Sequence, residues 1–117
     1  MSLRYVKGSM KNVDQDNDGT PDTLTFKLIN YIGTGSSYVT MKVIIDGKEY
    51  TDKASISIAG RDFVKIVPDM FVYSTYGDEI TIKVDHGGQI ELGKHKVVIE
   101  GEVAGFHSSI EFEDVDH

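Results

Sequence analysis

The chain has 117 residues, 39% of them hydrophobic, no cysteine and a formal net charge of −7. This size and composition predict one domain, spanning residues 1–117, around one core. The acidic balance argues against nucleic acid and anionic lipid as partners, and the lack of cysteine excludes disulfides and thiolate metal sites. No apolar run approaches the ~20 residues that a membrane-spanning helix needs.

The first notable feature along the chain is an acidic segment, VDQDNDGTPDTLTF, at residues 13–26. Its aspartates follow the spacing D-x-D-x-D-G-x-x-D, and alternate side chains of a tightly curled loop point toward its centre. Gly19 allows the chain to reverse after the third aspartate. Calcium accepts six to eight oxygen ligands in a forgiving geometry, so we expect a calcium site. The predicted ligands are the carboxylates of Asp14, Asp16, Asp18 and Asp22 and the backbone carbonyl of Thr20.

Other cations, and a turn without any metal, fit this segment less well than calcium does. Magnesium requires a smaller, near-octahedral shell and usually retains several waters, and zinc is disfavoured because no histidine or cysteine is nearby in sequence. The alternative to a metal site is a solvated acidic turn, since Asp, Asn and Gly are common in turns for local reasons. Such a turn would carry the repulsion among four carboxylates without compensation, which favours a bound cation.

The letters DQDNDGTPD, running directly into TLTFKL, resemble the calcium loops of FG-GAP repeats and of thrombospondin type 3 repeats. The EF-hand fits less well, because its loop needs a glutamate where this sequence has Thr25, and it needs flanking helices. The resemblance covers the loop alone. It implies calcium ligation by the five residues named above and a location outside the cell.

Beyond the loop, apolar residues alternate with polar ones, which is typical of half-buried strands. Turn signals recur about every 8 to 14 residues, and Asp46-Gly47 is the strongest hairpin signal. No segment has a helical apolar stripe, so helices should be absent or limited to single turns. We therefore predict an all-β, antiparallel two-sheet sandwich of immunoglobulin-like type with seven to nine strands. The alternating sets include Leu24/Phe26/Leu28, Val39/Met41/Val43/Ile45, Ile80/Ile82/Val84 and Val97/Ile99.

Three segments of the chain follow one another in a characteristic layout: VKGSMKNVDQDNDGTPDTLTFKLINYIGTGSS, GDEITIKV and LGKHKVVIEG. This layout is similar to that of the outer immunoglobulin-like domains of archaeal pilin and archaellin-type surface proteins. That family builds its filament from a hydrophobic N-terminal helix, which this sequence does not contain. The resemblance implies a cell-surface or extracellular location, and the strand-like start fits a part of a longer secreted or anchored protein.

The sequence offers little support for catalysis. The Gly33–Ser37 loop lacks the lysine of a phosphate-binding loop, so we interpret it as a hairpin loop. Two carboxylate pairs on strand faces lie ~6 to 7 Å apart, a spacing that could serve glycoside hydrolysis, but a solvated strand face explains them better. These pairs are Glu111/Glu113 and Glu100/Glu102. We expect no catalytic residue and no organic cofactor.

The strand pattern also predicts where two of the histidines point. His95 shares the parity of Val97, so it should face inward and bond to backbone, whereas His107 should face solvent. His86 lies in a glycine-rich turn. The segment Met70–Tyr76 breaks the alternation, so it either forms a partner or ligand surface or is a strand buried on both faces or a packed crossover.

Two functions remain open from the sequence. The first is a calcium-stabilised structural or adhesive module of a cell-surface protein or appendage, with other surface proteins or a second copy as partners. The second is a carbohydrate-recognition accessory module of a secreted protein, with a glycan as partner. The absence of tryptophan weighs against the second function, because sugar sites typically use a large aromatic platform.

Overall fold

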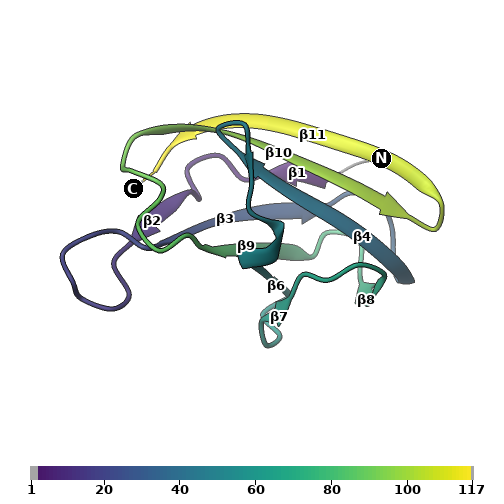
Figure 1. The fold of residues 1–117 in the computed structure, drawn as a ribbon. Helices are drawn as coiled ribbons and strands as arrows, with labels where there is room; N and C mark the ends of the chain where they lie inside the picture. Colours follow the sequence, from purple (N-terminus) through teal and green to yellow (C-terminus); the bar gives the residue numbers. More distant parts are fainter. Residues whose placement is uncertain (1–2, 117) are drawn as a thin grey trace.

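A computed structural model describes residues 3–116 and shows two antiparallel sheets packed face to face (Figure 1). The predicted all-β sandwich is therefore confirmed. Within the described residues there are eleven strands, more than the seven to nine expected, and helix is limited to one 3-10 turn, η1 (Thr51–Lys53). None of residues 3–116 belongs to a helix long and apolar enough to cross a membrane.

The first sheet has the strand order β1-β3-β9-β6-β7, with β2 also paired to β3. The short strands β1 and β2 follow one another along the same edge of β3, because Tyr5 pairs with Leu28 and Lys11 pairs with Thr25. The strands are β1 (Leu3–Tyr5), β2 (Lys11–Val13), β3 (Thr23–Asn30), β6 (Ala54–Ile58), β7 (Val64–Lys65) and β9 (Glu79–Asp85).

The second sheet has the order β11-β10-β4-β5, with β8 also paired to β4. Again two short strands share one edge: β5 pairs with the end of β4 and β8 pairs with its beginning. The long β10–β11 hairpin forms the upper layer in Figure 1. The strands are β4 (Gly35–Ile45), β5 (Lys48–Glu49), β8 (Met70–Ser74), β10 (Lys94–Val103) and β11 (Phe106–Val115).

Apolar side chains at the inward positions of the strands fill the space between the two sheets. Val43, Ile82 and Val97 are each fully buried, whereas Lys42 and Lys96 point to solvent. The predicted inward and outward positions of these strands are therefore correct. Side chains below 2% exposure include Phe26, Met10, Leu24, Leu28, Ile45 and Val84.

Of two predicted hairpin turns, the structure confirms the one at Asp46-Gly47 and contradicts the one at Gly33. Asp46 and Gly47 have φ of +52° and +83° and join β4 to β5, as expected for a type I′ hairpin turn. The loop at Gly33 is not a hairpin loop, because it carries the chain from β3 in the first sheet to β4 in the second. The Asn30 carboxamide holds this crossing: its oxygen accepts from the Ile32 amide at 2.8 Å, and its nitrogen donates to the Gly33 carbonyl at 2.9 Å.

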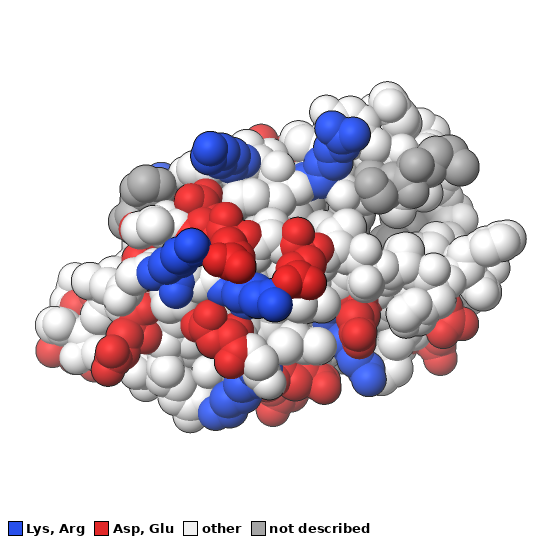
Figure 2. All heavy atoms as spheres, turned by 90° about the horizontal axis from the view of Figure 1, so that it is seen from above, with Lys and Arg blue, Asp and Glu red and all other residues white. Residues whose placement is uncertain are grey.

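Charged side chains of both signs are interspersed on the face seen from above in Figure 2. Lys96 lies 2.7 Å from Glu111, and Lys94 lies 3.2 Å from Glu113, across the β10–β11 pair. Exposed pairs of this kind contribute little to stability, because water and salt screen the charges. The net charge of −7 is therefore not gathered into one acidic field on this face.

Candidate functional site

The acidic loop, residues 14–22, joins β2 to β3 and extends from one end of the sandwich (Figure 1). The Asp22 amide donates to the Val13 carbonyl at 2.9 Å and closes the loop at its base. Asn17 and Gly19 have φ of +59° and +91°, so the chain reverses at these two residues. The reversal at Gly19 agrees with the role expected for it.

Three of the predicted ligands come together. Asp14, Asp16 and Asp18 each offer a carboxylate oxygen within 4.8 Å of the other two. Backbone amides face the same carboxylates: Asp14 accepts from Gly19 at 2.7 Å, and Asp18 accepts from Thr20 at 2.8 Å. The loop is thus organised by its own N–H groups around three converging carboxylates.

The other two predicted ligands have different surroundings. The Asp22 carboxylate accepts the Thr23 hydroxyl at 2.8 Å and the amides of Gln15 and Asp16 at 3.2 and 3.3 Å, and it is not part of the three-carboxylate group. The hydrogen bond from Thr23 lowers the pKa of Asp22. Thr20 contributes its backbone amide to Asp18. The hydrogen bonds of Asp22 and of the Thr20 amide thus help to shape the loop, and ligation by the Thr20 carbonyl and by Asp22 stays a prediction.

The close approach of the carboxylates changes their protonation. A hydrogen bond with Asp14, followed by desolvation and a hydrogen bond with Asp22, raises the pKa of Asp16 to about 6. One proton is then shared within the cluster at mildly acidic pH. A hard divalent cation at Asp14, Asp16 and Asp18 would replace that proton, because carboxylate oxygens are the ligands that calcium prefers.

A second candidate site is an aromatic face on the outer side of β4 and β8. Tyr38 and Phe71 are directly opposite one another in the β4–β8 register, their rings meet edge to face at 5.0 Å, and they are 63% and 64% exposed. Tyr73 is 50% exposed on the same strand as Phe71, and the Arg61 guanidinium lies 5.8 Å from the centre of its ring. The interpretation of this segment as a strand buried on both faces is therefore wrong, because β8 is an edge strand with one solvent-facing side.

The structure corrects the expected partners of His95. The side chain is buried as predicted, but its ring bonds to carboxylates instead of backbone: Nδ1 lies 2.7 Å from Asp46 and Nε2 lies 3.0 Å from Asp116. Burial alone would lower the pKa of His95, but the hydrogen bonds and charges of the two aspartates outweigh it and raise the pKa. Sequence reasoning missed this cluster because its members are 21 and 49 residues from His95.

His86 is a second buried histidine that the sequence did not identify. Its Nδ1 accepts from the amides of Gly88 and Ile90, both at 3.1 Å, so its proton resides on Nε2, which donates to the Asn12 carboxamide oxygen at 2.8 Å. Burial lowers the pKa of His86. This histidine is a neutral structural residue that fixes the turn between β9 and β10.

The carboxylate pairs weighed for catalysis lie on the outer faces of β10 and β11. Glu111 and Glu113 are exposed or half-exposed and each contacts a lysine, and His107 is exposed as predicted. Ion-paired carboxylates on an open sheet face have no enclosed space in which to activate a water or protonate a leaving group. The geometry supports the interpretation of these residues as surface charges.

Comparison with known families gives one match, to the family described as "CGDB: C-glycoside deglycosidase beta subunit", over residues 3–107. The matched range includes the acidic loop, the aromatic face and both buried histidines. No curated protein sequence matches this chain. Neither the loop motif nor the strand pattern had suggested this family.

Solved structures share the strand arrangement only distantly. A family 123 glycoside hydrolase from Clostridium perfringens has a TM-score of 0.49 at 11% identity over 97% of this chain. A conjugative transposon lipoprotein from Bacteroides eggerthii has 0.45 at 10% identity, covering 96% of this chain and 93% of the lipoprotein. The GAE domain of GGA2p from Saccharomyces cerevisiae has 0.36 at 10%, covering 98% and 96%. This chain spans 26% of the length of the Clostridium hydrolase.

Proposed function

Because the chain belongs to the C-glycoside deglycosidase beta subunit family, we propose that it is the non-catalytic subunit of a deglycosidase that acts on C-glycosides. The match over residues 3–107 is the observation that carries this proposal. A beta subunit works with at least one companion subunit, and we assign the chemistry to that companion. Of the two functions left open by the sequence, this agrees with an accessory role in carbohydrate processing.

The arrangement of ionisable side chains supports a non-catalytic role. The carboxylates of β11 pair with lysines on an open face, His86 is held neutral by two amides, and both nitrogens of His95 are engaged by aspartates. A general acid or base must reach its substrate with a free proton-transfer position. None of these groups among residues 3–116 meets that requirement.

We assign contact with the companion subunit to the aromatic face. Exposed aromatic residues are enriched at protein interfaces and supply much of their binding energy. Tyr38 and Phe71 form one preassembled pair on a strand edge, so little side-chain freedom is lost when a partner covers them. Tyr73, supported by Arg61, extends the same surface.

Co-expression with the companion subunit tests this assignment. The chain should co-purify as a stable complex, and Tyr38→Ser combined with Phe71→Ser should weaken that complex about 100-fold or more, as expected for central aromatic contacts. Leu92→Ser is the matched control, because Leu92 is also 63% exposed but lies before β10, away from the aromatic face. Equal effects of the two changes, or none, would refute the assignment of the interface, and failure of the wild-type chains to associate would refute the subunit role.

A second proposal concerns the acidic loop, which we propose binds calcium through Asp14, Asp16 and Asp18 and so stabilises the fold. The convergence of their oxygens within 4.8 Å favours this proposal. Calcium would add to the accessory role and does not compete with it. If the site has the affinity of extracellular modules, with a dissociation constant of about 10⁻⁴ to 10⁻³ M, it would fill outside a cell and remain empty in resting cytosol.

A further inference from the structure

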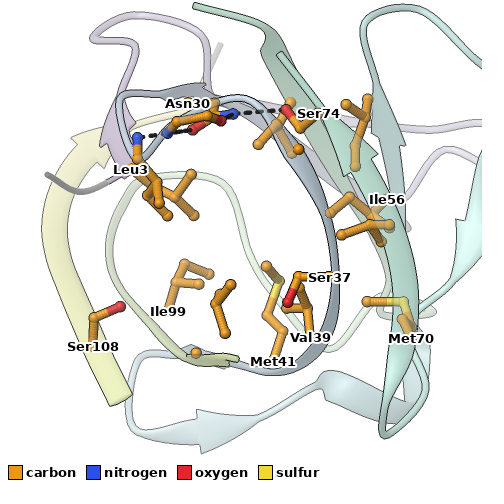
Figure 3. A pocket seen from close by; sticks show the side chains of 18 of the residues that line it. Leu3, Asn30, Ser37, Val39, Met41, Ile56, Met70, Ser74, Ile99 and Ser108 are labelled. Atoms are coloured by element: carbon orange, nitrogen blue, oxygen red, sulfur yellow. Dashed lines mark hydrogen bonds between the residues drawn. The ribbon is translucent and has the colours of Figure 1, made fainter. Parts of the chain in front are cut away.

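A hollow lies between the two sheets at the end of the sandwich near the tip of the β10–β11 hairpin (Figure 3). Its volume is about 120 Å³. Walls come from both sheets: Ile56 from the first faces Ile99 from the second, and Leu3 and Ser108 lie near its rim. The proposed subunit role does not use this space.

Small residues create the hollow. On the strands of the second sheet, inward positions that elsewhere hold Val, Ile or Met are occupied by glycine or serine at this end. Gly101 of β10 pairs with Ser108 of β11, and Ser37 of β4 pairs with Val72 of β8. At the next inward positions, Ile99 and Ile110 again close the space against the first sheet.

The backbone does not require glycine at position 101. Its φ is not in the left-handed region, and a Cβ built there would meet only the Thr40 carbonyl oxygen, at 3.9 Å, which is ordinary contact. A Cβ is therefore accommodated at this position, and we expect a larger side chain directed into the hollow to gain buried apolar surface. The missing side chain, and not a strained turn, leaves this part of the core open.

The wall has a defined chemical character. Among residues 3–116, no charged side chain lines the hollow, and most of the lining residues are aliphatic. Met41 and Met70 also line the hollow with flexible side chains. Methionine sulfur in general makes favourable contacts with aromatic rings, so these two residues suit an aromatic ligand. Asn30 is already bonded to the Gly33 carbonyl and to the Ser74 hydroxyl, so it forms a fixed polar wall.

We propose that this hollow is a binding site for a small, uncharged aromatic ring. Its volume is close to that of the engineered apolar cavity of roughly 150 Å³ that binds benzene. The space between two packed sheets suits a flat group, and the absence of lining charge excludes ionised ligands, which would lose their hydration without compensation. The hydroxyls of Ser37 and Ser108 at the rim allow a ring that carries a hydroxyl group.

Phenol and toluene are the probes for this site, added to the full chain and followed by methyl and amide NMR. Both should bind saturably and shift the signals of Ile56, Ile99 and Ile110 most. Benzoate, an ionised ring of similar size, should bind at least about tenfold more weakly, because the residues of the described chain that line the hollow include no cation.

A filled variant provides the decisive comparison. Gly101→Leu should lose at least about tenfold in affinity for phenol while its melting temperature stays the same or rises, since a fitted side chain adds burial without strain. Glu102→Leu, which adds the same side chain at the neighbouring outward position, should leave binding unchanged. Ser108→Leu fills the hollow from the neighbouring strand of the same sheet in case Gly101→Leu does not fold.

Several results would overturn the proposal. These are the absence of saturable binding to the wild-type chain, binding of phenol by both filled variants as tightly as by the wild-type chain, or shifts centred away from the hollow. Displacement of phenol by the companion subunit would also overturn it, since the hollow would then receive a side chain of that subunit. The first three results do not depend on whether the two subunits assemble, and displacement of phenol requires that they do, so failure of the binding site leaves the subunit role standing.

Discussion

The Nε2 atom of His95 lies 3.0 Å from Oδ2 of Asp116, and this contact ties the residue that follows β11 to the start of β10. The other carboxylate oxygen of Asp116 accepts the Gly93 amide at 2.9 Å. On the far side of the ring, Asp46 joins the β4–β5 turn to the same histidine. One buried imidazolium thus holds together two turns and the C-terminal segment of the described chain.

The raised pKa of His95 predicts how this latch depends on pH. Because the folded state binds the proton more tightly, the stabilisation is fully present below the ordinary value of 6.5 and is lost as pH rises through the raised pKa. An NMR titration should give a pKa for His95 above 6.5. Asp116→Asn should cost about 1.5–3 kcal/mol of unfolding free energy at mildly acidic pH and less in alkali. A pKa at or below 6.5 would contradict the latch.

His86 should show the opposite behaviour. Burial lowers its pKa, so the unfolded state takes up a proton first, and stability is lost as pH falls from 6.5 toward the lowered folded pKa. Nitrogen-15 NMR should find the neutral tautomer with the proton on Nε2 at a pH where His95 is already charged. A His86 that charges together with His95 would be inconsistent with the two amides donating to Nδ1.

The two faces of β9 should respond differently to truncation. Ile82 is fully buried, so Ile82→Ala should cost about 2–5 kcal/mol of unfolding free energy. Lys83 faces outward, where its ammonium lies 4.7 Å from the Phe63 ring centre, so Lys83→Ala should cost less than about 1 kcal/mol. Urea denaturation of both variants measures the difference, and similar costs would mean that the register of β9 is wrong.

Calcium should raise the melting temperature of the chain. At a free concentration ~100 times the dissociation constant, binding adds about 2.7 kcal/mol, which is several degrees for a domain of this size. Asp16→Ala or Asp18→Ala should remove most of that gain. Affinity should weaken below about pH 6, because the hydrogen bond with Asp14, desolvation and the hydrogen bond with Asp22 raise the pKa of Asp16 to about 6, and the proton that Asp16 then binds competes with the metal.

The control for the calcium ligands is Asp62, an exposed aspartate outside the acidic loop. The aspartate of the β4–β5 turn, Asp46, is unsuitable as a control. Asp46 accepts the His95 ring and the Lys96 amide, so its removal destabilises the fold for another reason. Asp62→Asn should leave the calcium effect intact. Magnesium or sodium at matched ionic strength separates specific binding from relief of aspartate repulsion. Equal stabilisation by those ions would leave the loop as a solvated turn.

Much of the fold was predictable because alternation along β3, β4, β9 and β10 reports which side of each strand is buried. Of the short strands, β2 was missed, since three residues are too few to show a period of two, whereas β5 was expected as the second strand of the Asp46-Gly47 hairpin. The strands β1 and β2 pair along a shared edge of β3, and such pairing is not visible in local sequence.

The candidate sites divide in the same way. The convergence of Asp14, Asp16 and Asp18 was predictable from spacing within one loop. The link from His95 to Asp46 and Asp116 joins residues distant in sequence, and the hollow at Gly101 depends on register between four strands. Neither leaves a local pattern. For the aromatic face, the sequence showed only a break in alternation, which left a partner surface and a buried strand as alternatives. The sequence could not decide between them, because an edge strand can expose large residues on one side.

The proposed subunit role is tested most directly by the rate of C-glycoside cleavage by the companion subunit as this chain is added. We expect the rate to rise by about tenfold or more, a change of ~1.4 kcal/mol in activation free energy, and to saturate at a fixed ratio of the two chains. This chain alone should release no sugar from the C-glycoside. An unchanged rate at saturating amounts of this chain, or cleavage by this chain alone, would contradict the proposed role.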